Sequence, residues 1–400
     1  MRRTLAAGLT LLTVTALATP TTAAAEEAAS GKGRGMAALT GFAFLPAQTF
    51  VPGSEPSGAA LGTTPVNGVT PPFADQPVQG FSGLVRNSDG TFDAISDNGY
   101  GTKANSADFL LRIHRIAPDF AKNTVDVLGG ITLTDPNGHI PFPLTRPDRV
   151  ITGADIDIES VTRGADGTYW MGDEFGPYLL HFDRAGRLLA PPVPLPGVRA
   201  PENPAGSPNL GGSKGFEGLT LSPDGKTLNA LLEGTVAGDA PGTLRLNEFD
   251  VAGNAFTGKT WRYRLEDPNF AIGDAIAVDA NRLLVIERDS AQGADALVKR
   301  VYLADKRDRD RDGVLDKTMV ADLLNLANPK RLGGHADPFR FPFVTIEDVT
   351  ILDDRTIAVL NDNNFPSSSG RTPGRPDDNE FITVRLAENL HADPRVLRRR

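Results

Sequence analysis

Five segments of the chain share one arrangement of acidic and turn-forming residues. In each, a polar or acidic residue opens an alternating apolar run, and a turn residue follows seven positions later. A second apolar run then ends on acidic or amide residues. The opening and turn residues are Ser82 and Asp89, Glu159 and Asp166, Glu217 and Asp224, Asp274 and Asn281, and Glu347 and Asp354. Carboxylates gathered at one place would suit Ca²⁺, which takes oxygen ligands, and would suit general base catalysis.

The repeated segment predicts two short antiparallel strands joined by a tight turn. An Asp-Gly pair between alternating apolar runs indicates a hairpin, because glycine supplies the positive φ that the turn requires. The copies start 77, 58, 57 and 73 residues apart, which fits one four-stranded unit with loops of varying length. We therefore predict an all-β fold, a β-propeller of five four-stranded blades, with six blades as the alternative. A strand near residues 40–45 is expected to complete the last blade and close the ring.

The N-terminus reads as an export signal. Arg2 and Arg3 precede an apolar run over residues 5–18, and small residues up to Ala25 offer a cleavage site. We expect a signal peptide at 1–25, a flexible leader at 26–37, the propeller domain at 38–390 and a basic C-terminal tail at 391–400. The predicted location is extracellular, and the composition fits a bacterial source.

Composition excludes several classes of function. The chain has no cysteine, which rules out disulfides, thiolate catalysis and Cys-ligated metals. Its formal net charge of −9 argues against a nucleic-acid partner. Beyond the N-terminus, no apolar run is long enough to predict a membrane span. We expect a monomer that acts on a small molecule.

The acidic ends of the strands predict a metal site at one rim of the propeller. Carboxylate and amide oxygens around one axis would repel one another without a cation among them. The expected ligands are Glu159, Asp173, Glu217, Glu347, Asp362 and Asn363. We favour Ca²⁺, with Mg²⁺ as the alternative ion. In the competing interpretation, each acid accepts backbone N–H bonds within its own blade, and Arg288 only neutralises a neighbouring acid.

A second metal prediction falls on a charged insertion. Residues 308–316 place acids at the first, third, fifth and ninth positions of a calcium-loop pattern, with Gly313 at the sixth. The expected ligands there are Asp308, Asp310, Asp312 and Asp316. Met319 stands where the pattern has its bidentate glutamate. A solvated hairpin tip is the alternative interpretation.

Signals for a nucleophile or base are sparse. Ser213 lies in a Gly-x-Ser-x-Gly sequence, but no helix is predicted after it, as a nucleophile elbow would require. We expect Glu217, Glu159 and His335 to be the catalytic residues, with His139 as the alternative histidine base.

The motifs, taken in order, resemble those of a known family. They are GFSGL with SDNG, DIESV with GDEFGPYL, GFEGL with SPDGKTL and LEG, then LLVIERD, then EDV with LNDNNF. This run, over about residues 80–388, resembles the family named for the esterase-like activity of phytase. The resemblance implies a secreted bacterial propeller that hydrolyses phosphate or carboxylic esters.

The sequence thus favours a secreted, calcium-dependent hydrolase of phosphate or carboxylic esters. Two alternatives stay open. One is a non-catalytic binding propeller that calcium only stabilises, and the other is a lactonase-type hydrolase in which calcium polarises the ester carbonyl.

Overall fold

The chain folds almost entirely into β-strands. The computed structural model describes residues 35–203 and 206–398, so the predicted signal peptide and most of the predicted leader lie outside the described residues. Met36–Arg400 forms one compact unit. Among the described residues, helical structure is confined to three 3₁₀ turns and the one-turn α2 (Pro394–Leu397). The all-β prediction is confirmed.

Strands that follow one another in the chain pair into four-stranded sheets. Three sheets have the orders β6-β7-β8-β9, β10-β11-β12-β13 and β14-β15-β16-β17. Their strands are β6 (Ile158–Arg163), β7 (Tyr169–Asp173), β8 (Tyr178–Phe182), β9 (Val193–Pro194), β10 (Phe216–Leu221), β11 (Thr227–Leu232), β12 (Thr243–Asp250), β13 (Ala255–Arg264), β14 (Ala271–Ala277), β15 (Arg282–Arg288), β16 (Lys299–Asp305) and β17 (Asp316–Asp322). This arrangement is propeller-like, as predicted.

The remaining strands form one sheet of eight. Its order is β18-β19-β20-β1-β5-β4-β3-β2. The strands are β1 (Ala38–Leu45), β2 (Phe81–Arg86), β3 (Phe92–Ser96), β4 (Arg112–Asp119), β5 (Thr124–Thr132), β18 (Asp348–Asp353), β19 (Thr356–Leu360) and β20 (Asn379–Arg385). The N-terminal β1 pairs antiparallel with β20 from Ala38 to Leu45. It meets β5 only at Phe44 and Thr124, in parallel, so this sheet is two groups of four strands joined at one bridge.

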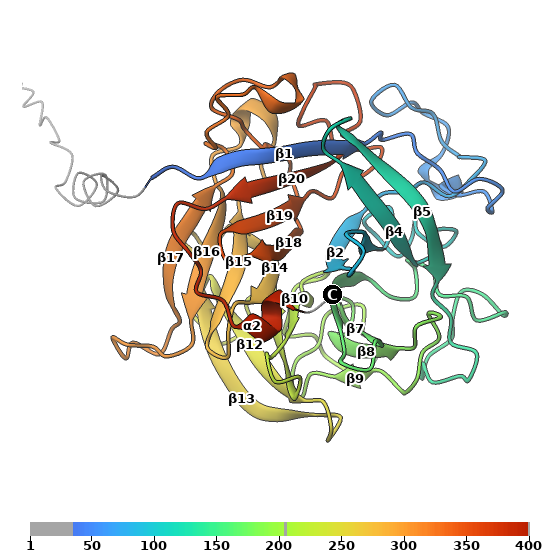
Figure 1. Cartoon of the computed structure of the whole chain (residues 1–400). Helices are drawn as coiled ribbons and strands as arrows, with labels where there is room; N and C mark the ends of the chain where they lie inside the picture. The colour runs from blue at the N-terminus through green and yellow to red at the C-terminus, as the bar shows by residue number, and fades with distance from the viewer. Residues whose placement is uncertain (1–34, 204–205, 399–400) are drawn as a thin grey trace, which may run out of the picture. The chain divides into compact units, whose positions relative to one another are not determined.

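The first strand of each group faces its neighbours around a centre. β2 contacts β6 and β18, β6 contacts β10, β10 contacts β14, and β14 contacts β18. In Figure 1, β2, β10, β14 and β18 lie toward the middle of the unit, with the later strands of each sheet farther out. We call β2, β6, β10, β14 and β18 the inner strands. The first residues of these five strands lie at one end of the unit, and their last residues lie at the opposite end.

The core lies between neighbouring sheets. Alternating apolar residues from adjacent sheets pack together, for example Ile95 and Ile113 against Met171 and Leu180. β1 contributes to such a layer through Phe42, which is 5% exposed and packs against Phe339. No helix in the described part of the chain is long and apolar enough to cross a membrane.

We predict that Phe42→Ala lowers the free energy of unfolding by about 3 kcal/mol, because it removes a buried aromatic side chain and leaves a cavity. Urea unfolding followed by tryptophan fluorescence measures the change. The matched variant Leu297→Ala, at a side chain that is 77% exposed, should change stability little. Equal losses in the two variants would contradict the place of β1 in the core.

Candidate functional site

β-Bulges place acidic side chains at the start of the inner strands. In β6, Ile158 pairs with Asp173 and Ser160 with Gly172, so Glu159 is skipped. In β10, Phe216 pairs with Leu232 and Gly218 with Leu231, so Glu217 is skipped. A bulged residue has no cross-strand partner, which re-aims its side chain. Glu159 and Glu217 therefore hold equivalent positions, as the repeat predicted.

The second strand of each group supplies another set of side chains. Asp97, Glu174 and Glu233 follow the second strands, and their N–H groups donate to the carbonyls of Gly80, Asp157 and Gly215 at 2.7, 2.9 and 2.9 Å. The same strand pairing places Arg288 and Asp362 at this position in the other two sheets. Four acids and one arginine thus occupy equivalent places.

These residues, with Asp157 and Glu347, form what we call the acidic ring. Its members among the described residues are Asp97, Asp157, Glu159, Glu174, Glu217, Glu233, Glu347 and Asp362. All except Asp97 are at least nine-tenths buried. Because like charges in a poorly solvated space repel strongly, the ring needs cations or protons among its carboxylates.

Two acids of the repeat are absent from the ring. The bulge in β14 falls at Gly273 and not at Asp274, which pairs with Ile286. A Cβ at Gly273 would overlap the carbonyl oxygen of Ile346. Asp274 instead accepts backbone N–H bonds from Ala275 and Val349 at 2.6 and 2.9 Å. The repeat aligns Asp274 with Glu159 and Glu217, but the residue at their position is Gly273, one residue earlier. The expectation that Asp274 joins the ring was therefore wrong, because the apolar pattern does not reveal which residue is bulged.

Glu287 is also turned away from the ring. Its carboxylate accepts bonds from the Tyr263 hydroxyl at 2.8 Å and the Glu266 N–H at 2.6 Å, and it pairs with Lys317 at 2.8 Å. These contacts hold it on the other face of β15. Arg288, the next residue, points into the ring in its place.

The guanidinium of Arg288 places a positive charge on one side of the acidic ring. Its Nη2 lies 3.3 Å from Glu347, 3.4 Å from Glu233 and 3.9 Å from Glu217. Burial opposes the charge of Arg288, yet these carboxylates raise its pKa. Gly273 and Arg288 come from the same sheet. This sheet has no acidic residue at its bulge and supplies an arginine to the ring instead.

The loop before β10 lies against the ring. Lys214 Nζ donates to Glu233, and Ser213 Oγ donates to Asp157 at 2.6 Å. Ser213 has a positive φ of 46°, which is uncommon for a residue other than glycine. Gly215 has no room for a Cβ, because the backbone of Glu174 lies against it. The loop thus brings one cation and one hydroxyl to the carboxylates.

Within the acidic ring, two groups of carboxylates have the spacing of a cation site. Asp157, Glu159 and Glu174 can place one oxygen each within 4.8 Å of the others, and so can Glu174, Glu217 and Glu233. Glu174 Oε1 and Glu217 Oε1 are buried and accept no hydrogen bond. Buried carboxylate oxygens without donors are costly unless a cation meets them. An all-oxygen set suits Ca²⁺ or Mg²⁺, so the residues present fit such an ion.

Four ring carboxyls, those of Glu159, Glu174, Glu217 and Glu347, hold protons more tightly than isolated carboxyls do. Burial, then repulsion from Asp157 and Glu347, raises the pKa of Glu159 well above its ordinary value. Burial, then Glu233, does the same for the pKa values of Glu174 and Glu217. The pKa of Glu347 rises to about 8, through burial and the nearby Asp362. A bound cation would displace these protons.

Three predicted ligands are already occupied by hydrogen bonds. Asp173 accepts the N–H groups of Asp157 and Gly176 at 3.0 and 2.6 Å. Asn363 accepts from the Gly80 N–H and donates to the Asp377 carbonyl. Asp362 accepts from Thr345 Oγ1 at 3.0 Å and the Asn364 N–H at 2.7 Å. For these residues the capping interpretation describes the geometry.

His335 does not reach the carboxylates. Its ring packs between Phe42 and Phe339, with centroids 4.6 and 5.1 Å away. Burial and then the charge of Arg371 lower its pKa to about 4. The expectation of a histidine base at the rim was wrong for His335, because its loop returns to the core beside β1.

The 308–316 loop is remote from the ring. It joins β16 to β17, the outer strands of their sheet. Oxygens of Asp308, Asp310 and Asp312 can approach within 4.8 Å. The N–H groups of Asp312 and Gly313 donate to Asp308, and that of Arg309 donates to Asp316. A calcium ion at this loop stays a prediction.

We predict that the cation-free protein loses stability between pH 6.5 and 8.5. Folded-state pKa values near 8 for Glu347 and near 7 for Asp173 and Asp274 exceed the values of about 4 in an unfolded chain. The folded state therefore binds more protons in this window, so its stability falls as pH rises.

Thermal melts in EGTA measure this loss, and excess Ca²⁺ should reduce it. His114 and His335 have folded pKa values of about 3 and about 4. Their rise in stability with pH is nearly complete by about pH 7.5. Lys299, whose folded pKa falls to about 8, also raises stability with pH near the top of the window, but the three carboxyls together contribute the larger loss. A melting temperature that rises from pH 6.5 to 8.5 in EGTA would contradict the account.

Comparisons with known proteins identify a family for this chain. A relative from Arthroderma benhamiae, described as an "Uncharacterized secreted protein", is 26% identical over 340 residues, and the match covers 63% of this chain and 64% of that protein. Among solved structures, a luciferin-regenerating enzyme (TM-score 0.37, 10% identity, 78% of each chain) and the Dos1 propeller (TM-score 0.33, 9% identity, 78% of this chain and 69% of the other) are similar. At these scores, nothing about the chemistry of this chain follows.

The match to a protein family is more specific than these similarities. Residues 76–365 match the family described as "Esterase-like activity of phytase". They include β2 to β19 and every member of the acidic ring. The chain therefore belongs to the phytase-like family.

Proposed function

We propose that the protein is a secreted, calcium-dependent hydrolase of phosphate or carboxylic esters, with its catalytic centre at the acidic ring. The observation that carries the proposal is the pair of buried oxygens, Glu174 Oε1 and Glu217 Oε1, that accept no hydrogen bond. Family membership supports ester hydrolysis, and the secreted relative supports export. We also infer that the sheets are five blades, closed by β1 alongside β20.

The proposed ion site is the Asp157, Glu159 and Glu174 group. This side of the ring has three carboxylates that can converge, and Arg288 lies on the other side, against Glu233 and Glu347. Ser213 and Asn98 donate to Asp157 and hold its orientation. Bound there, Ca²⁺ supplies positive charge that polarises a substrate oxygen and favours water deprotonation.

Glu217 is the proposed general base. Its Oε1 accepts no hydrogen bond, and burial, followed by repulsion from Glu233, raises its pKa well above the ordinary value, which makes it a stronger base. It lies between the proposed ion site and Arg288, 3.9 Å from the guanidinium. A water held at Oε1 would pass its proton to Glu217 and attack an ester placed between the two positive charges. The bond to the leaving alcohol would then break, and the protonated Glu217 would return the proton to that alcohol oxygen.

Arg288 and Lys214 are the proposed contacts for negative charge on the substrate. Both are cations beside the ring, and the Lys214 side chain is 44% exposed. Guanidinium and ammonium groups bind phosphate or carboxylate oxygens through charge-assisted hydrogen bonds. Charge developing on the ester oxygen during attack would be stabilised in the same way.

A non-catalytic, calcium-stabilised binding propeller is the second candidate. It is favoured by a cavity of about 720 Å³ whose described lining residues include no member of the acidic ring. A lactonase-type hydrolase would use the same ring with a cyclic ester as substrate. A panel of phosphate monoesters, aryl esters and lactones, assayed in Ca²⁺ and in EGTA, separates these candidates.

We predict that Glu217→Gln lowers kcat by at least about 100-fold while keeping the calcium-dependent rise in melting temperature, because it removes the base and leaves the ion site. The control Glu388→Gln, at an exposed carboxylate, should retain activity. Full activity in Glu217→Gln would remove Glu217 from the mechanism.

We predict that Glu159→Gln has opposite effects with and without calcium. In EGTA at pH 8 it should raise the melting temperature, because one buried repelling charge is gone. In excess Ca²⁺ it should abolish most of the calcium-dependent gain, because a ligand is lost. A variant that melts like the wild type under both conditions would show that Glu159 holds no ion.

A further inference from the structure

A cavity of about 720 Å³ lies toward the end of the inner strands opposite the acidic ring. Its wall includes Val161 and Arg163, which follow Glu159 along β6, and Leu219 and Leu221, which follow Glu217 along β10. The ring acids lie at the start of these strands and the cavity residues lie later. The two places are therefore separate, and the proposed hydrolysis does not use the cavity.

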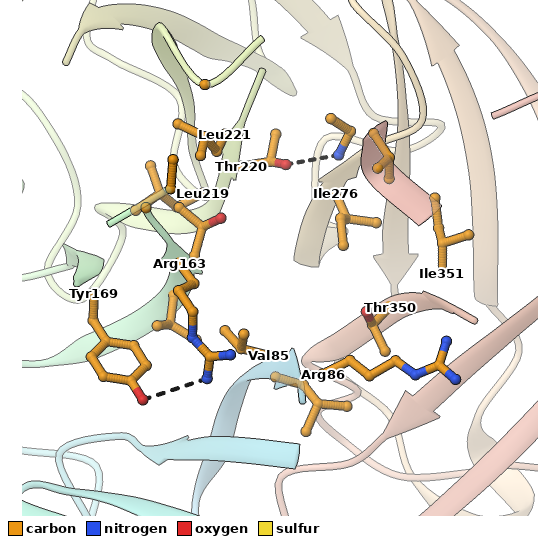
Figure 2. A pocket seen from close by; sticks show the side chains of 18 of the residues that line it. Val85, Arg86, Arg163, Tyr169, Leu219, Thr220, Leu221, Ile276, Thr350 and Ile351 are labelled. Carbon is orange, nitrogen blue, oxygen red and sulfur yellow. Dashed lines mark hydrogen bonds between the residues drawn. The ribbon is translucent and has the colours of Figure 1, made fainter. Parts of the chain in front are cut away.

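Much of the cavity wall is apolar. Leu219, Ile276 and Ile351 line it from three different inner strands, and Figure 2 shows these side chains around one space. A volume of this size is in the range of about 300–1,000 Å³ that is typical of small-molecule sites. The space can hold an apolar group larger than a few methylenes.

Arginines give the same cavity a positive charge. Its charged lining residues are Arg86, Arg115, Arg163, Arg184, Arg395 and Arg398, against Asp224 and Asp274. The excess of arginines belongs to a chain whose formal net charge is −9, so it is a local feature. A cationic, partly apolar recess concentrates anions.

Neighbouring acids outside the cavity balance only part of this charge. Arg115 and Arg163 share one carboxylate, that of Asp93, and Arg395 pairs with Asp393 at 2.7 Å. Arg184 donates to the carbonyl of Asp166, and a carbonyl carries no net charge to cancel that of the arginine. In Figure 2, Arg86 and Arg163 reach among the apolar side chains of the wall.

The C-terminal segment completes the wall. Arg395, Val396 and Arg398 line the cavity, and α2 is fixed to the end of β14 through the Asp393 N–H, which donates to the Val278 carbonyl at 2.9 Å. Asp393 accepts from the Arg395 N–H at 2.8 Å and caps the turn. Two of the arginines therefore come from a segment anchored over the inner strands.

We infer that this cavity binds an organic anion with an apolar body, such as an alkyl or aryl sulfate, phosphate or carboxylate. The arginines contact the anionic head, and the inner-strand side chains Leu219, Ile276 and Ile351 surround the apolar body. The inference is independent of the proposed hydrolase activity.

Calorimetric titration of the full chain with octyl sulfate, below its micelle concentration, tests the inference. Inorganic sulfate and octyltrimethylammonium are the comparison ligands. We expect octyl sulfate to bind at least about tenfold more tightly than either, and equally well in Ca²⁺ and in EGTA, because the acidic ring is elsewhere.

Each of the other outcomes would overturn one part of the inference. Equal affinity for inorganic sulfate would show that the apolar wall contributes nothing. Equal affinity for octyltrimethylammonium would remove the role of the arginines. Loss of octyl sulfate binding in EGTA would place the ligand at the acidic ring, and no binding at all would overturn the whole inference.

Paired variants locate the ligand. Arg184→Gln with Arg398→Gln should weaken octyl sulfate binding by about tenfold, whereas Lys330→Gln with Arg375→Gln removes the same charge from exposed positions and should not. Ile276→Phe should weaken binding by filling the cavity, with thermal melts as the check on folding. Equal affinity in both charge pairs would place the ligand outside this cavity, whatever happens to Ile276→Phe.

Discussion

Mutual repulsion among buried carboxylates is the constraint on which the rest of this site depends. Seven of the eight ring acids are at least nine-tenths buried, and each taken from water loses hydration that only opposite charge or protons can replace. The inner strands bring these acids together because the core between the sheets fixes where each strand begins. The packing that stabilises the fold therefore also brings mutually repelling carboxylates together at its centre.

The positive charges that offset this repulsion are distributed unequally around the ring. The β14–β17 sheet has Gly273 where β6 and β10 have a glutamate, and Arg288 where the other four groups of strands have Asp97, Glu174, Glu233 and Asp362. Arg288 satisfies Glu233 and Glu347, and Lys214 adds a second positive charge at Glu233. Among the described residues, Asp157, Glu159 and Glu174 receive hydroxyl and amide donors but no ion pair, which is why the proposed cation site lies on their side of the ring.

Local patterns were sufficient to predict the strands but not their irregularities. The turn residues, three of them in Asp-Gly pairs, and the alternating apolar runs identified all five hairpins. The equivalence of Glu159 and Glu217 followed from the repeat. The bulge in β14 could not be read from the sequence, since Gly273 and Asp274 both fit the pattern. The neighbour Asp157 was missed, although it stands two residues before Glu159. Arg288 was weighed as a neutralising charge, but its contact with carboxylates from other sheets depends on tertiary packing that no local pattern encodes.

Anomalous diffraction from crystals grown with Tb³⁺, a luminescent and strongly scattering substitute for Ca²⁺, tests the central claim most directly. The account predicts a peak about 2.3–2.6 Å from oxygens of Asp157, Glu159 and Glu174, with Arg288 still against Glu233 and Glu347. A ring without a peak at saturating Tb³⁺, or an ion that has displaced Arg288, would contradict it.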